Sequence, residues 1–228
     1  MSNKIKLLYI GLAVLIFFTL WSSNQDADKS SASIRVWNAH INEQGKLDVL
    51  GVVLGQSTLK EAEEILHTQS ERALFVDVKD NEHKGDTLEA YFPTSPDRAK
   101  LFLELVASDE LIAKIKKRAY KATVFPSGNV KLAVAPEQMA EIETTVVKSL
   151  TYRPPISLTP ETVEKNFGPA DRKLNDGDGN IHLLYPALGL DVVIAREGKP
   201  LLQFVAPADF GRLLELLDVD DSQKTPPQ

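Results

Sequence analysis

Two segments of this chain, residues 58–66 and 159–167, carry the same helix pattern in different halves of the sequence. When Thr58 is superposed on Thr159, apolar residues recur four and eight positions later in both segments. Residues spaced by four lie on one face of an α-helix, so both segments are predicted to form short amphipathic helices. An internal duplication constrains the fold strongly, because each copy is expected to build the same supersecondary unit.

Both helices have clear start signals. Thr58 and Glu61 form the pattern of a capping box, in which each side chain accepts a hydrogen bond from the other residue's backbone N–H. Thr159 is followed by Pro160, which is typical of an N-cap with proline in the first helical position. Gly168 and Pro169 end the second helix.

The segments that follow the helices also match. A strand ending in an aromatic residue and proline is predicted at 88–93 and again at 181–186, and a strand leading into a proline-started helix at 134–139 and 205–210. The remaining segments are predicted to form β-hairpins, which pair 101–106 with 111–116, 190–195 with 201–205, and, only in the first unit, 120–125 with 130–135.

These patterns predict an α+β fold with an N-terminal transmembrane helix followed by two related helix/antiparallel-sheet modules. We expect two separate antiparallel sheets, each covered on one face by helices, with the seam at 152–155. The predicted domains are a signal-anchor at 1–23, a tether and lead-in at 24–46, a first module at 47–150, a second module at 151–218 and a disordered tail at 219–228.

The segment Leu7–Gln25 contains no charged residue and follows Lys4 and Lys6. As a helix it would be roughly 28 Å long, close to the ~30 Å thickness of the bilayer hydrocarbon. Lysines before such a segment are expected to stay in the cytoplasm, which places the rest of the chain outside. The sequence therefore predicts a single-pass membrane protein with its C-terminal body outside the cytoplasm.

A cleaved secretory signal is the alternative, and it would release a soluble periplasmic protein. Signal peptidase requires small residues one and three positions before the cut. Cutting after Ser23 would place Trp21 at the third position, and cutting after Ala27 would place Gln25 there. An uncleaved anchor is therefore favoured, with Trp21 at the far membrane interface.

The part of the chain beyond the anchor is acidic. Two of the 26 basic residues precede the anchor, which leaves 24 basic against 32 acidic residues and a net charge of −8. Such a body is a poor candidate for binding nucleic acid. The chain has no cysteine, so it has no disulfide and no thiolate metal site, and no cofactor is predicted.

The pattern from Thr159 through Val163 to Phe167, Gly168 and Pro169, followed by a β-meander, resembles the opening of SmpA/OmlA-type modules. The chain as a whole resembles a group of uncharacterised membrane-anchored envelope proteins of Gram-negative bacteria. The resemblance implies a small α+β module with an accessory, non-catalytic role in the cell envelope.

The first unit departs from the motif of that family. Ala62 stands where the motif has valine, and His67 stands where it has glycine. The chain also lacks the lipidated cysteine that usually carries such modules.

No cluster of chemistry-bearing residues stands out. The four histidines have no metal or triad spacing. His182 is the most interesting, and is interpreted as a partly buried strand histidine bonded to backbone, with a catalytic or pH-sensing role as the alternative.

Ser57 lacks the partners of a nucleophile elbow, and 176–180 is interpreted as a hairpin loop rather than a calcium site. The carboxylates of the first helix suit the positive end of its dipole.

Five residues are named as candidate binding residues. Lys114, Lys116 and Arg118 are predicted to share one face of a strand, either as a solvated face or as a docking surface for an acidic partner or lipid headgroups. Tyr185 and His182 complete the set.

The leading functional hypothesis is a non-enzymatic, membrane-anchored periplasmic protein that binds another envelope protein. The first alternative is a module that binds a ligand or cell-wall fragment in the cleft between the units. Its candidate linings are Trp37, Tyr91, Phe92 and Tyr185, although core packing is the preferred interpretation of each. The second is a hydrolase that uses His182 and a carboxylate of raised pKa. The oligomeric state is left open.

Overall fold

One ten-stranded antiparallel sheet organises the computed structural model, which describes residues 35–77, 85–95, 98–126 and 128–217. A three-stranded sheet precedes it and consists of β1 (His40–Ile41), β2 (Leu47–Val49) and β3 (Val52–Val53). The strands of the large sheet are β4 (Glu71–Asp77), β5 (Thr87–Phe92), β6 (Lys100–Leu105), β7 (Ala122–Val124), β8 (Asn129–Ala133), β9 (Val147–Arg153), β10 (Arg172–Asn175), β11 (Ile181–Tyr185), β12 (Leu190–Ile194) and β13 (Leu201–Val205).

The helices of the described residues are short. The α-helices are α2 (Leu59–Leu66), α3 (Asp109–Arg118), α4 (Met139–Glu143), α5 (Pro160–Phe167) and α6 (Phe210–Leu216). Single 3-10 turns form η1 (Arg35–Asn38), η2 (Pro136–Gln138) and η3 (Pro207–Asp209).

The order of the strands in the large sheet is β10-β11-β12-β13-β9-β6-β5-β4-β8-β7. After α2, strands β4, β5, β6 and β9 lie side by side in chain order, and after α5 strands β10 to β13 do the same. The last strands of the two units, β9 and β13, pair with each other in antiparallel orientation. The two units are therefore arranged edge to edge, in the manner of a local two-fold axis between β9 and β13.

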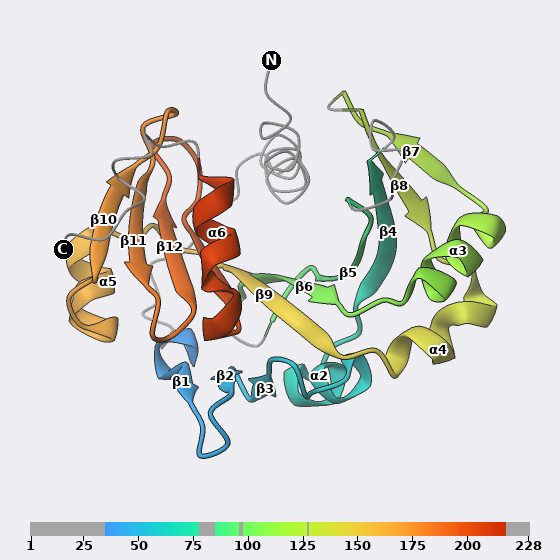
Figure 1. Ribbon diagram of the computed structural model, residues 1–228, viewed down its shortest axis with the longest axis horizontal. Coiled ribbons are helices and arrows are strands. Elements are labelled where there is room, and N and C mark those ends of the chain that lie inside the picture. Colours follow the sequence, from blue (N-terminus) through green and yellow to red (C-terminus); the bar gives the residue numbers. More distant parts are fainter. Residues whose placement is uncertain (1–34, 78–84, 96–97, 127, 218–228) are drawn as a thin grey trace.

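One face of the sheet, the core face, carries a single hydrophobic core that runs through both units. Across the junction Leu150 lies opposite Phe204, and Tyr152 lies opposite both Leu101 and Leu202. All five side chains are fully buried. Figure 1 shows α2, α3, α4 and α5 outside the curved sheet, on this side.

The opposite face, the second face, differs between the two units. In the second unit α6 covers it, because Phe210 and Leu213 pack against Leu174 and Leu184. In the first unit it carries an aromatic cluster, which comprises Ala73, Phe75, Tyr91, Phe102 and Phe125.

The expected helices are confirmed. Thr58 and Glu61 form the full capping box at the start of α2, and Thr159 accepts a hydrogen bond from the N–H of Thr162 at the start of α5. His67 holds the left-handed C-cap of α2 with φ of 52°. Left-handed backbone favours glycine, and the corresponding residue of the second unit is Gly168, whose φ is 85°.

The expectation of two separate sheets is wrong. Residues 147–153 form β9, which pairs with β6 of the first unit and with β13 of the second. The predicted seam at 152–155 therefore begins inside a central strand, and the predicted module boundary after residue 150 also falls within β9. The apolar alternation of a strand identifies its buried face but not its neighbours, so no local pattern indicates this pairing.

The hairpin predicted to pair 101–106 with 111–116 is also wrong, because 109–118 forms helix α3. Ser108 caps it, Asp109 and Glu110 lie in its first turn, and Leu111 and Ile115 are its buried residues. Leu111 and Ile115 are four residues apart, so a helix buries both on one side. Lys114, Lys116 and Arg118 consequently lie on a helix and do not share a strand face.

The proline-started helices after β8 and β13 are confirmed as η2 with α4 and η3 with α6. Their strands, however, hold different places in the sheet. β13 completes the meander of the second unit, whereas β8 pairs with β4 and β7 at the far end of the first unit. The segment α3-β7-β8-η2-α4 is thus an insertion between β6 and β9 (Figure 1).

The predicted transmembrane helix within residues 1–23 lies outside the described residues. Among the helices that are described, none has the length and apolar character needed to cross a membrane.

We expect Gly189→Ala to destabilise the protein far more than Gly55→Ala. Both glycines have φ near +70°, but a Cβ at Gly189 would overlap the carbonyl oxygen of Val205, whereas nothing lies within 4 Å of one at Gly55. Gly55→Ala should cost about 1 kcal/mol for the left-handed backbone alone. Gly189→Ala should lower the free energy of unfolding by at least about 3 kcal/mol, measured by urea denaturation. Equal losses would show that β12 and β13 are not held in this register.

Candidate functional site

Titratable side chains gather in four places among the described residues. They are a cluster around Arg72 between α2, β4 and α4, a cluster around His182 on β11, the basic residues of α3, and Glu89 on the second face of the first unit.

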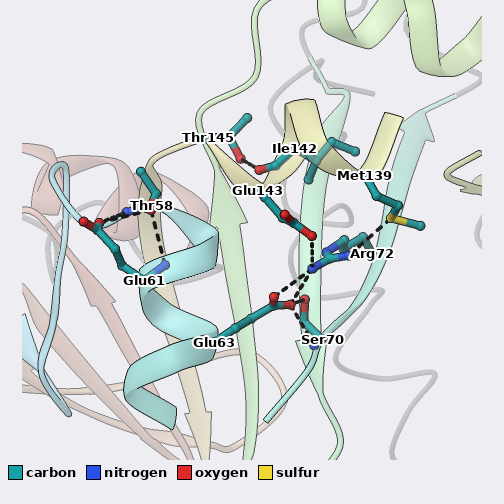
Figure 2. A network of polar contacts seen from close by, with 9 residues as sticks. All are labelled: Thr58, Glu61, Glu63, Ser70, Arg72, Met139, Ile142, Glu143 and Thr145. Carbon is teal, nitrogen blue, oxygen red and sulfur yellow. Dashed lines mark hydrogen bonds and ion pairs between the residues drawn. The ribbon is translucent and has the colours of Figure 1, made fainter. Parts of the chain in front are cut away.

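The Arg72 cluster is a buried ion pair with further polar neighbours (Figure 2). Nη2 of Arg72 on β4 lies 2.7 and 2.8 Å from the two carboxylate oxygens of Glu63 on α2. The backbone N–H and the hydroxyl of Ser70 also donate to Glu63. From α4, Glu143 lies 3.5 Å from Nη2, and the sulfur of Met139 accepts from Nη1.

This arrangement is suited to stabilising the packing of the helices on the sheet. The Arg72 and Glu63 side chains are only 8% and 4% exposed, so neither is open to a substrate. A charge taken out of water needs a close opposite charge and hydrogen bonds, and Glu63 receives both. The pair fixes α2 to β4, and Glu143 adds α4.

The sequence contains a signal for this cluster in the position of Glu63. Leu59, Ala62 and Leu66 define the buried side of α2, and Glu63 falls on the same side. The carboxylates of α2 were predicted to interact with the helix dipole, but the dipole does not explain a carboxylate on the buried side of the helix. A buried cation that pairs with Glu63 does explain it. Arg72 likewise takes an apolar place on β4, on the same face as Leu74.

His182 lies between two carboxylates. Its Nδ1 is 2.8 Å from Asp191 on β12, and its Nε2 is 3.4 Å from Asp176 at the end of β10. Since a carboxylate accepts and does not donate, both ring nitrogens carry a proton when both carboxylates are ionised. The partners of His182 are thus side chains rather than the backbone groups that the sequence predicted.

The charges of this cluster depend on one another. Burial of the His182 ring opposes its charge, but the hydrogen bond and charge of Asp191, together with those of Asp176, outweigh burial and raise the pKa of His182. Burial also raises the pKa of Asp191. The pair therefore retains a proton to higher pH than a histidine in water.

An Asp–His pair is the arrangement that orients a general base, as the hydrolase hypothesis requires. Here the imidazole has no nitrogen left for a substrate, because Asp176 occupies the second one, and the side chain is 6% exposed. Asp176 also accepts hydrogen bonds from the backbone of Asp178 and from the backbone and side chain of Asn180. The cluster therefore joins the β10–β11 turn, a hairpin loop as predicted, to β12.

Three basic residues of α3, Lys114, Lys116 and Arg118, are each paired with a carboxylate from another part of the fold. Lys114 contacts Glu141 at 3.1 Å, and Arg118 contacts Glu137 at 3.9 Å. A further partner of Lys114 is Glu110 on α3 itself. Lys116 pairs with Asp86, whose side chain is 1% exposed. These pairs tie α3 to its neighbours through residues that were predicted to form either a solvated face or a docking surface.

Tyr185 and the other predicted cleft linings lie mostly in the core. The Tyr185 hydroxyl donates to the carbonyl oxygen of Gly168 at 3.0 Å, and burial raises the pKa of Tyr185 to about 12. Its ring and that of Trp37 both pack on Phe167. Phe92 is fully buried. Tyr91 alone lies on the second face, where its ring stacks on Phe102.

Glu89 lies among these second-face aromatic side chains. Burial and the carboxylate of Glu104, directly opposite on β6, raise the pKa of Glu89 to about 8. The adjoining cavity, with a volume of about 10 Å³, is lined by Phe75, Tyr91 and Lys131 among others. That volume holds about one water molecule, so it does not admit a substrate.

Among the described residues, no three His, Asp or Glu side chains are arranged to hold a metal ion. Comparison with known proteins gives no match to any family model, any curated protein or any solved structure.

We expect a double-mutant cycle to show that Arg72 and Glu63 stabilise the fold as a buried ion pair. Glu63→Leu or Arg72→Met alone leaves one buried charge without its partner, and each should lower the free energy of unfolding by about 3 kcal/mol. The double variant should lose much less than the sum, because no buried charge remains. Lys173→Met, which breaks the exposed pair with Glu164, is the control and should cost far less. Additive losses would argue against a direct pair.

We expect His182 to stabilise the protein most at low pH. Its pKa is raised in the folded state, so the stabilisation is fully present below about 6.5, the unfolded value, and is lost as pH rises through the folded value. The difference in unfolding free energy between the wild type and His182→Gln, measured in urea from about pH 5 to 9, should shrink with rising pH. His40→Gln, at an exposed position, is the control. A difference that grows with pH would contradict the assignment.

Proposed function

We propose that the protein is a non-enzymatic interaction module of the bacterial cell envelope. Its body would lie in the periplasm, attached to the inner membrane through the uncharged segment Leu7–Gln25. Its partner would be another envelope protein.

What supports an interaction role is the internal pairing of the charged clusters. Arg72, His182 and three basic residues of α3 each contact a carboxylate from another part of the same chain; the three are Lys114, Lys116 and Arg118. Clusters closed in this way stabilise the fold, and none of their own groups is poised for proton transfer or nucleophilic attack. Surfaces of the sheet and its edges then remain as the parts that can act on another molecule.

The proposal predicts a discrete partner in cells. A photo-activatable amino acid would be placed at Val124, Ile156 and Lys165, three exposed positions on different elements or loops. Crosslinking in intact cells should give a product of defined mass from at least one position. External protease should cut the chain in spheroplasts but not in intact cells. Only diffuse products from all three positions, or full protection in spheroplasts, would contradict the proposal.

A further inference from the structure

The large sheet ends at β7, whose outer edge has no neighbouring strand among the described residues. Ala133 donates a hydrogen bond to the carbonyl of Lys121, and Phe125 donates one to the carbonyl of Asn129. In an antiparallel ladder the residues that bond to the neighbouring strand alternate with residues that point away. Ala122 and Val124 therefore direct their N–H and C=O groups away from β8.

Two large apolar side chains at this edge are exposed to solvent. Val124 is 71% exposed and Tyr120, just before the strand, is 70% exposed. Only five large hydrophobic side chains of the described residues are exposed, and these two lie within five positions of each other. Ala122 and Val124 project on the same side of the strand, because successive side chains alternate.

The other side of the same edge carries two lysines beside Phe125 of the aromatic cluster. Lys121 alternates with Ala122 and so projects on the opposite side, and Lys131 lies on that side opposite Thr123. Lys121 and, at the end of α3, Lys117 form no ion pair with a carboxylate of the described residues. The edge thus combines a backbone that can accept a strand, an apolar side and a cationic side.

The opposite edge of the sheet lacks this combination. On β10, Lys173 is paired with Glu164, and Leu174 is buried against α6. None of the five exposed large hydrophobic side chains among the described residues lies on β10.

We propose that β7 is a docking edge for an extended acidic segment of a partner protein, which adds an eleventh strand to the sheet. The inference rests on the proposed interaction function and names where and what the module binds. Up to about four backbone hydrogen bonds would form at Ala122 and Val124. Apolar side chains of the segment would pack beside Val124, and acidic side chains would meet Lys121 on the other side.

Charge argues against a second copy of the chain as the occupant. Two β7 edges paired with each other would bring their lysines together, and edge lysines are a common device against such self-association. An acidic strand meets the same lysines with attraction.

The test uses the full-length chain in detergent micelles and a fluorescein-labelled peptide of about nine residues, the length of a long strand, in which valine and glutamate alternate. Fluorescence anisotropy should show saturable binding to the wild type. Val124→Pro removes an outward N–H without removing a bond to β8, and should weaken binding at least about tenfold. Circular dichroism checks that this variant is folded.

Charge variants provide the matched control. Lys121→Glu should weaken binding roughly fivefold, as expected for the loss of a surface ion pair. Lys165→Glu makes the same change of charge on an exposed position of α5 and should leave binding unchanged. A peptide with lysine in place of glutamate should not bind.

Several results would overturn the proposal. They are unchanged binding by folded Val124→Pro, equal binding of the lysine peptide, and self-association of the wild type that Val124→Pro abolishes. Crosslinks in cells from Ile156 or Lys165 but not from Val124 would refute the docking edge and leave the interaction module standing. No discrete crosslink from any position would refute both.

Discussion

The antiparallel pairing of β9 with β13 is the interaction on which the rest of the architecture depends. Each unit alone presents a four-stranded meander with an open edge, and four strands bury only a small core. Joining the edges makes one sheet and lets Tyr152, Leu150 and Phe204 share a core that neither unit could close alone. Buried hydrophobic area therefore grows across the junction, and the two copies cannot separate without exposing it.

Buried charges hold the helices and hairpins to this sheet. Arg72 links β4 to α2, and His182 links the β10–β11 turn to β12. In both places a charged side chain stands in an apolar position of its element and finds its counter-charge on another. Such pairs add less free energy than hydrophobic residues of equal size, but they penalise any packing that separates them. Their role is to restrict the ways in which the elements can be arranged.

The parts of the fold that depend on local signals could be predicted from the sequence. Thr58 and Thr159 mark helix starts through their own side chains, and the 120–125 hairpin is set by its turn. The parts that depend on distant partners could not. Residues 111–116 fit both a strand and a helix, and the cap at Ser108 decides between them. The β9–β13 pairing has no local signal in the sequence. The burial of Glu63 is explained only by its contact with Arg72 on another element, which the sequence does not reveal.

The duplicated units differ where the first one carries the α3-β7-β8-η2-α4 insertion, and this difference has a physical consequence for the sheet edges. Without the insertion, the sheet would end at β4 on one side and β10 on the other, and both ends would be equivalent. The insertion adds β8 and β7 beyond β4 and so creates an edge with no counterpart in the second unit. The ion pair of Lys116 with Asp86 ties the insertion to the body, whereas both partners of Lys114, Glu110 and Glu141, lie within the insertion. Lys117, near the end of α3, and Lys121, just before β7, form no ion pair with a carboxylate of the described residues. A specific interaction needs a surface that the rest of the molecule does not repeat, and the insertion supplies one.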